Sequence, residues 1–181
     1  WALPVQQTAA QANLSAGAND GLLLSWIERD AGKGHRLQMA EYQGGKWSAA
    51  RNIAKGNDWF VNWADFPSTA ALPDGTLWAH YLVKRSAGTY AYDVMLKQSK
   101  DGGRNWSAPV SAHNDGTESE HGFVSLWPWS SSELAVAWLD GRNTAGAASH
   151  DHKQHDAKGG ADKGMTLRAA VFGKSGRKIN E

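Results

Sequence analysis

The stretch Ser99-Lys100-Asp101-Gly102-Gly103-Arg104-Asn105-Trp106 decides the fold of this chain. It has the composition of a tight turn between two strands, in which the Asp101 carboxylate accepts backbone N–H bonds and a glycine supplies a positive φ. Trp106 is expected to cover the hairpin and to pack into the sheet. The pattern S-x-D-x-G-x-x-W has its fixed positions at Ser99, Asp101, Gly103 and Trp106. We interpret all four as structural residues, without a catalytic role.

The sequence on either side of this turn repeats. Short apolar runs that end in an aromatic residue occupy 21–26, 76–81 and 133–138, so the aromatic residues are spaced by 55 and then 57 residues (from 26 to 81 and from 81 to 138). Each run follows a turn signal and precedes a polar loop and another alternating segment. The unit is therefore four short antiparallel strands in about 55 to 60 residues, which is typical of a propeller blade.

We therefore predict an all-β fold, a β-propeller of four-stranded blades with about three blades in a single partial propeller over residues 1–181. The first blade unit is expected at 13–56, the second, which contains the turn, at 67–114, and the third, with a His-rich insertion at 145–164, at 123–178. Helical repeats are the competing interpretation. They are disfavoured because the apolar segments are short and are separated by Asp-Gly and Gly-Gly turns.

Composition excludes several classes of protein. The chain of 181 residues has a formal net charge of +1, so no nucleic-acid partner is expected from bulk charge. It contains no cysteine, which removes disulfides and thiol catalysis. No apolar stretch approaches the roughly 18 residues of a membrane span. The 10 tryptophans and 20 glycines suit many short strands joined by tight turns.

The turn pattern makes the chain resemble the Asp-box (BNR-repeat) β-propellers, and segments 61–67, 120–126 and 138–142 look like bacterial sialidase-like, exo-alpha-sialidase family proteins. The resemblance covers most of residues 13–172. It implies a sialidase-like propeller of six blades, of which this chain would hold half. A half ring leaves unpaired sheet edges. We therefore expect either a fragment whose missing second half completes the propeller, which we favour, or a homodimer of two such halves.

One face of the propeller is expected to carry the chemistry. In a four-stranded blade the loops after strands two and four share a face, and these loops hold almost every unusual polar residue of the chain, whereas the opposite turns are short. The resemblance implies a glycosidase that uses a tyrosine nucleophile and three arginines that hold the carboxylate of the substrate. It also implies action at or beyond the cell envelope, hence a secreted or periplasmic protein.

Candidate site residues follow from these loops. Asp65 is the candidate general acid, because Trp63 and Phe66 beside it would raise its pKa. The other candidate catalytic residues are the possible nucleophiles Tyr90 and Tyr92, the partner carboxylate Glu120 (or Asp140), and His121 near the central cavity. The candidate substrate-binding residues are Arg29, Arg85, Arg142, Asp140, Asn62 and Trp63.

The insertion contains His150, His152 and His155, which form the one metal-like cluster of the sequence. Imidazole and carboxylate groups bind zinc, copper or nickel, but a loop of this composition often binds metal only adventitiously. No other cofactor is expected.

The predicted function is a sialidase-like glycoside hydrolase of the exo-alpha-sialidase type, with a carbohydrate or glycoconjugate as partner. The first alternative is a non-catalytic Asp-box propeller that binds glycan or protein through its loop face, because fold does not fix function. The second is a metal-dependent protein that uses the histidine loop. The Arg-Ile-Pro segment typical of true sialidases is absent, which keeps the non-catalytic alternative open.

Overall fold

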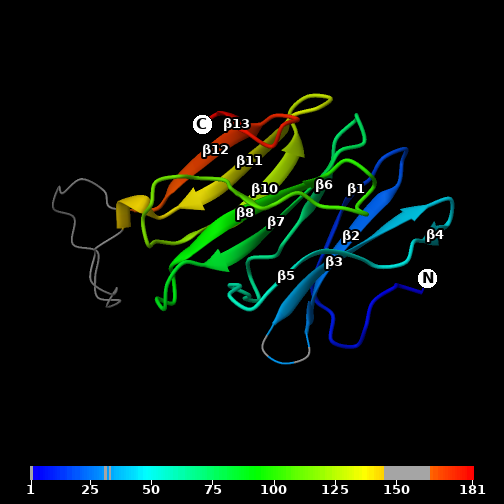
Figure 1. The fold of residues 1–181 in the computed structure, drawn as a ribbon, viewed down its shortest axis with the longest axis horizontal. Helices are drawn as coiled ribbons and strands as arrows, with labels where there is room; N and C mark the ends of the chain where they lie inside the picture. Colours follow the sequence, from blue (N-terminus) through cyan, green and yellow to red (C-terminus); the bar gives the residue numbers. More distant parts are fainter. Residues whose placement is uncertain (1, 31, 33, 145–163) are drawn as a thin grey trace.

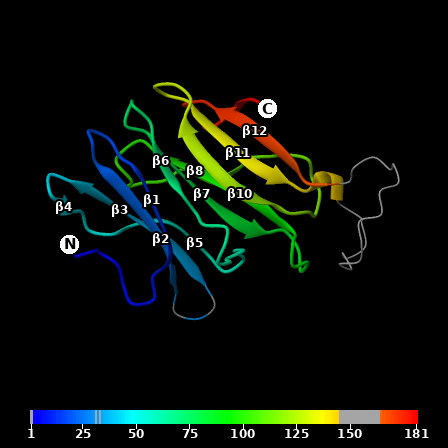
Figure 2. The same cartoon turned by 180° about the vertical axis from the view of Figure 1, so that it is seen from behind.

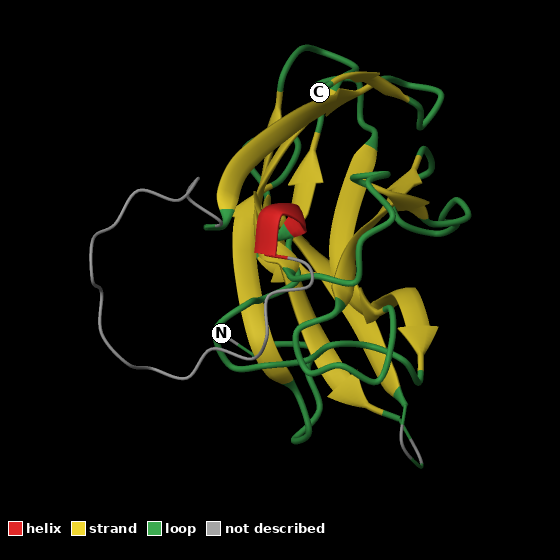
Figure 3. Ribbon diagram, turned by 90° about the vertical axis from the view of Figure 1, so that its left-hand side faces the viewer, coloured by secondary structure: helices red, strands yellow, loops and turns green. Residues whose placement is uncertain are grey.

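The computed structural model describes residues 2–30, 32, 34–144 and 164–181. The described chain is built from short antiparallel strands, and Figure 1 labels most of them. Their bounds are β1 (Ala10–Ala16), β2 (Leu22–Arg29), β3 (His35–Gln43), β4 (Lys46–Trp47), β5 (Arg51–Gly56), β6 (Thr69–Ala71), β7 (Leu77–Lys84), β8 (Tyr92–Ser99), β9 (Val110–Ser111), β10 (His121–Pro128), β11 (Leu134–Asp140), β12 (Thr166–Phe172) and β13 (Lys178–Asn180). The short 3-10 helix η1 (Arg142–Thr144) follows β11, and no α-helix occurs among the described residues (Figure 3).

The strands form three sheets in chain order. The first sheet has the order β1-β2-β3-β4, with β5 also paired to β3, the second has the order β6-β7-β8-β9, and the third has the order β10-β11-β12-β13. Figures 1 and 2 show the three sheets side by side, from blue through green to red. The second sheet lies between the other two, because β6 contacts β1 and β2 on one side and β10 on the other. The prediction of an all-β fold with four-stranded antiparallel sheets is confirmed.

Two main core layers lie on either side of the second sheet, and a smaller cluster of Leu24, Trp26 and Ala40 lies in the first sheet. Alternate residues of β7 point into different layers, as the two-residue period of a strand requires. Ala79 and Tyr81 pack with residues of the first sheet such as Leu37. Trp78 packs with residues of the third sheet such as Phe172. The central strand is therefore buried on both faces, which explains its nearly continuous apolar sequence.

The turn between β8 and β9 has the structure that its sequence predicts. Asp101 Oδ1 accepts the backbone N–H groups of Arg104 at 3.1 Å and Asn105 at 2.9 Å, and it also accepts the Ser99 hydroxyl at 2.8 Å. Gly103 has a φ of 79° and donates its N–H to Ser99 Oγ at 2.9 Å. Trp106 packs against the layer between the first and second sheets. The carboxylate thus closes the turn while the indole anchors it.

The first sheet differs from the four-stranded expectation. Gly44 and Gly45 have φ values of 58° and 83° and make a tight hairpin, which pairs the two-residue strand β4 with the end of β3. The chain then leaves the ladder and returns as β5, which pairs with the other half of β3. The fourth strand is therefore split in two.

Candidate functional site

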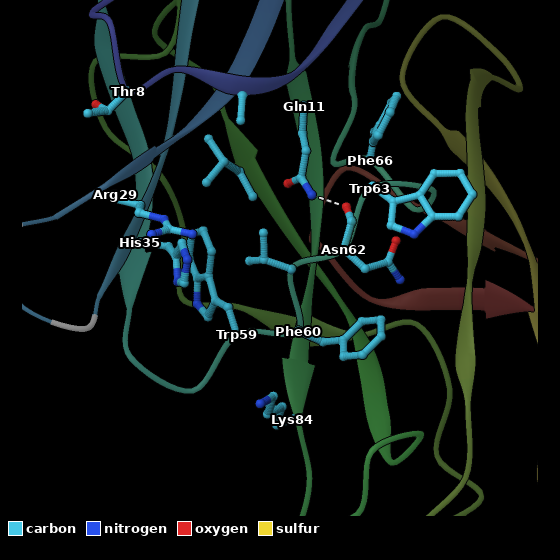
Figure 4. A pocket seen from close by; sticks show the side chains of 13 residues that line it. Thr8, Gln11, Arg29, His35, Trp59, Phe60, Asn62, Trp63, Phe66 and Lys84 are labelled. Atoms are coloured by element: carbon cyan, nitrogen blue, oxygen red, sulfur yellow. Dashed lines mark hydrogen bonds between the residues drawn. The ribbon is translucent and has the colours of Figure 1, made fainter.

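The loop that follows β5 borders an open pocket of about 870 Å³ (Figure 4). Its walls come from β1, β2, β3, the end of β7 and the loop that joins the first sheet to the second. Several polar and aromatic side chains reach it. They are Thr8, Gln11, Arg29, His35, Trp59, Phe60, Asn62, Trp63, Phe66 and Lys84.

The loop that carries the aromatic residues is fixed to the edge of the second sheet by its backbone. Phe60 donates its N–H to the carbonyl of Leu82 at 3.0 Å, and Lys84 donates its N–H to the carbonyl of Asp58 at 2.7 Å. On the other side, the Gln11 side-chain amide donates to the carbonyl of Asn62, as the dashed line in Figure 4 shows. The pocket therefore has a floor held by hydrogen bonds from two sheets.

Three basic side chains meet in this pocket. Arg29 ends β2, His35 begins β3 and Lys84 ends β7, so all three reach the same side of the molecule. Burial lowers the pKa of His35, and the nearby charges of Arg29 and Lys84 lower it further. Within the part of the chain that the structure describes, no ion pair holds Arg29 or Lys84. The pocket is therefore suited to an anionic group.

Aromatic side chains complete the pocket. Trp59 is buried and lies 6.5 Å from His35, ring centroid to ring centroid, with an interplanar angle of 11°. Trp63 has 87% of its surface exposed and Phe66 has 41%. An exposed indole in the same pocket as basic and amide groups suits a ligand with an apolar ring face and polar edges.

Asp65 leaves the same loop in the opposite direction. Asn62 Oδ1 accepts the backbone N–H groups of Ala64 at 2.7 Å and Asp65 at 2.8 Å, and this turn sends Trp63 outward and Asp65 inward. The Asp65 side chain reaches the third sheet, where Oδ2 accepts the N–H of Phe123 at 2.8 Å. Only 4% of Asp65 is exposed.

Burial raises the pKa of Asp65 and the Glu120 carboxylate adds to the shift, although the Phe123 hydrogen bond opposes it. The expected direction of the shift was correct. The expected cause was wrong for Trp63, because that side chain points into solvent.

Tyr92 and Glu120 form a pair beside Asp65. The Tyr92 hydroxyl donates to Glu120 Oε1 at 2.6 Å, and its ring stacks on Phe60 at a centroid distance of 3.9 Å. Only 1% of Tyr92 is exposed, and burial together with this hydrogen bond raises the pKa of its hydroxyl. Tyr92 therefore has a carboxylate partner, whereas Tyr90 is 65% exposed.

The three candidate arginines lie in different surroundings. Arg29 lies in the pocket. Arg85 pairs with Asp93 at 2.9 Å. Arg142 binds Asp140 through Nε at 2.7 Å and through Nη2 at 2.8 Å. The structure therefore brings one of the three predicted arginines to the pocket.

Asp140 is completely buried and is part of a second cluster, between the second and third sheets. Its Oδ2 also accepts the Trp138 indole N–H at 2.8 Å. Burial opposes ionisation here, but hydrogen bonds from Arg142 and Trp138 hold the pKa of Asp140 below its usual value. His121 lies in the same cluster, stacked on His113 at a centroid distance of 3.7 Å.

Sequence reasoning did not assign a role to several residues of these two groups. His35 and Lys84 were missed because each is one basic residue at the end of a strand. His113 and Asp115 were not predicted as site residues, although their spacing of two residues in a polar loop was an available signal. His150, His152 and His155 lie outside the described residues.

The chain has similar proteins among solved structures only. No protein-family model matches the chain, and no curated protein matches it. Among solved structures, the chain is similar to an α-L-arabinanase from Penicillium chrysogenum complexed with arabinobiose, with a TM-score of 0.55 and 16% identity over 96% of this chain and 48% of that one.

Two further solved structures are similar to the chain. An α-L-arabinofuranosidase from Fusarium graminearum in complex with an iminosugar inhibitor has a TM-score of 0.54 and 14% identity over 96% of this chain and 48% of its own. A protein of unknown function from Dyadobacter fermentans has a TM-score of 0.56 and 14% identity over 90% of this chain and 37% of its own.

These similarities support a β-propeller fold for the chain. The chain spans less than half the length of each of these three structures. No helix among the described residues is long and apolar enough to cross a membrane.

Proposed function

We propose that the chain is part of a glycan-acting β-propeller, a sialidase-like glycoside hydrolase of the exo-alpha-sialidase type. One observation carries the proposal. An open pocket combines an exposed indole with three basic side chains. The loop that lines this pocket also carries Asp65, a carboxyl group whose pKa is raised. The similarity to an arabinanase and an arabinofuranosidase supports a carbohydrate ligand at the level of the fold.

In this proposal the pocket selects an acidic sugar. Arg29 and Lys84 attract the sugar carboxylate, because neither forms an ion pair with another described residue. Trp63 covers one face of the sugar ring, and Asn62 is available to its hydroxyl groups.

The chemistry would use the three groups behind the pocket. Asp65, whose pKa is raised by burial, donates its proton to the glycosidic oxygen in this route as that bond breaks. The Tyr92 oxygen forms the new bond to the anomeric carbon and gives its proton to Glu120. Water then cleaves the glycosyl–tyrosine bond: Asp65 takes a proton from the water, and the departing tyrosine oxygen takes its proton back from Glu120. Because Tyr92 is 1% exposed, this route requires Phe60 to move away from the tyrosine ring.

A second function, glycan binding without turnover, is favoured by the burial of Asp65 and Tyr92. Asp65 and Tyr92 are covered, whereas the pocket residues Trp63 and Phe66 are open to solvent. A ligand bound in the pocket would then touch the aromatic and basic groups but neither of the two buried ones.

The two functions are separated by a panel of fluorogenic glycosides that includes a sialoside, a uronide and an α-L-arabinofuranoside. We expect turnover of the acidic sugars, loss of that turnover in Asp65→Asn, and weaker substrate binding in Arg29→Gln. Arg85→Gln is the matched control, because Arg85 pairs with Asp93 away from the pocket. Saturable binding without turnover supports the second function, and the absence of both overturns both proposals.

The remaining blades of the ring belong to the proposal as well. Six blades would be completed by further residues of a longer chain or by a second copy, in accord with the share of the solved structures that this chain covers. Light scattering distinguishes the two, because a homodimer has twice the mass of the 19.6 kDa chain. A protein that acts on such glycans would be secreted or periplasmic.

A further inference from the structure

The cluster around His121 has no role in the proposed hydrolase. It lies where the second and third sheets meet, and its side chains come from the loop between β9 and β10 and from the ends of β8, β10 and β11. The groups that face one another are His113, His121, Asp93, Asp115 and Asp140.

The hydrogen bonds of His121 define its tautomer. Its Nδ1 lies 3.2 Å from the carbonyl oxygen of Tyr92 and 3.1 Å from that of Ser119. A carbonyl oxygen can only accept, so Nδ1 carries a proton and donates it. In a neutral imidazole the other nitrogen, Nε2, then presents a lone pair.

Two carboxylates lie within 4 Å of Nε2. Nε2 lies 3.2 Å from Asp115 Oδ2 and 3.8 Å from Asp140 Oδ2. His121 is 0% exposed, and its Nε2 has no hydrogen-bond partner among the described residues. Arg142 Nη2 lies 3.5 Å from Asp115 Oδ2 and 2.8 Å from Asp140 Oδ2 and so offsets part of their negative charge, but it gives Nε2 no partner. A buried lone pair beside two carboxylate oxygens is repelled by them, unless a positive charge lies between the three atoms.

We propose that His121 Nε2, Asp115 Oδ2 and Asp140 Oδ2 bind one divalent transition-metal ion, with zinc as the best fit. The three ligand atoms lie within 4.8 Å of one another, which suits an ion with metal–ligand bonds of about 2.0 to 2.2 Å. One imidazole and two carboxylates are a donor set that zinc accepts, and water can complete the coordination.

The groups behind the ligands are already arranged as in metal sites. A metal-binding histidine usually donates its second ring N–H to a carbonyl or carboxylate, as His121 Nδ1 does here. Ligating carboxylates are themselves held by hydrogen bonds. Trp138 and Arg142 hold Asp140, and the N–H of Thr117 holds Asp115 Oδ1 at 2.9 Å.

His113 is a positioning residue in this proposal. Its ring is nearly parallel to that of His121, with an interplanar angle of 10°, so the ring planes do not converge on one ion. Its Nδ1 lies 2.8 Å from Asp115 Oδ2 and orients that carboxylate. The alternative trio of Asp93, His113 and His121 is disfavoured for the same reason, and because His121 Nδ1 already donates to carbonyls.

The ion would fasten the loop of Asp115 to the end of β11, and so the second sheet to the third. The loop also carries Glu120, whose carbonyl accepts the N–H of Gly141 at 2.7 Å. Loss of the ion is therefore expected to loosen the junction between the two sheets.

The test uses the full chain with His150, His152 and His155 replaced by glutamine, so that the insertion cannot supply the ligands. After removal of metal with a chelator, zinc is titrated by calorimetry, and the zinc retained after gel filtration is counted. We expect about one ion per chain, a dissociation constant of about 1 µM or lower and a higher Tm with zinc than with EDTA.

Two variants in this background locate the site. Asp115→Asn removes one ligand oxygen and should weaken zinc binding by about tenfold or more. Asp93→Asn is the matched control and should leave the affinity nearly unchanged. Equal losses in both variants, or a loss only in Asp93→Asn, would overturn the ligand assignment.

If Asp115→Asn fails to fold, the histidine-loop variant, which keeps Asp115, His121 and Asp140, still tests the proposal. In the histidine-loop variant, cobalt should produce a visible absorption band that zinc displaces. If that protein retains no zinc and its Tm is the same with zinc and with EDTA, the metal proposal is wrong.

Discussion

His80 lies in the middle of β7 and is completely buried, and we expect it to make the fold sensitive to mild acid. Its Nδ1 accepts the N–H of Ser68 at 3.2 Å, while Nε2 has no partner among the described residues. Burial lowers the pKa of His80 from 6.5 to about 3. The folded protein therefore holds His80 neutral at pH values where the unfolded chain binds a proton.

The sign and size of the effect follow from proton linkage. Because the folded pKa is depressed, the contribution of His80 to stability is fully present above pH 6.5 and is lost as the pH falls toward the folded value. Each pH unit in that interval is worth about 1.4 kcal/mol. Between about pH 7.5 and about pH 4.5 the free energy of unfolding should fall by about 2.7 kcal/mol through His80 alone.

The assay is urea denaturation of the wild type and of His80→Gln at both pH values. The glutamine amide keeps an acceptor for the Ser68 N–H but has no proton to gain in this range. Other titrating groups contribute equally to both proteins, so the variant should lose about 2 to 3 kcal/mol less than the wild type on acidification. Equal losses in the two proteins would refute the reasoning, whatever the stability of the variant at neutral pH.

Three further predictions concern single positions. In Gly122→Ala the new Cβ would overlap Asp65 Oδ2 and lie 3.1 Å from Tyr92 Cε2, so we expect a loss of about 1 to 3 kcal/mol in urea denaturation. Asp101→Ala should lower the Tm by calorimetry because the turn loses its acceptor, and Asp101→Asn should lower it less; equal effects would contradict this role. Trp63→Ala should weaken glycan binding in the pocket while the free energy of unfolding stays within about 0.5 kcal/mol, and unchanged binding would remove Trp63 from the site.

Much of the fold could be read from local signals. The repeated spacing of the aromatic residues Trp26, Tyr81 and Trp138 located the second strand of each sheet, because short strands joined by tight turns leave a period in the sequence. The turn at Ser99–Trp106 was predictable in detail, since its hydrogen bonds join residues close in sequence. The split fourth strand of the first sheet was not predicted, because it depends on where β5 returns to β3.

For the candidate site, the sequence predicted only which loops lie on one face of the molecule. Strand order showed which loops share that face, and the structure does bring Asp65, Tyr92 and Glu120 together. The distribution of the arginines was not readable, since Arg142 is paired with Asp140, two residues away, whereas Arg29 remains open to the pocket.

The sequence by itself determined the class of secondary structure, the repeat and the closed turn, because these depend on strand periodicity and on contacts within a few residues. Tertiary structure alone decided which side chains became neighbours and which were buried. Asp65 and Phe123 lie 58 positions apart, and the raised pKa of Asp65 arises from burial between two sheets. The burial that raises the pKa of Asp65 and the position of His121 Nε2 near two carboxylates both depend on the packing of distant strands. Local sequence does not encode that packing.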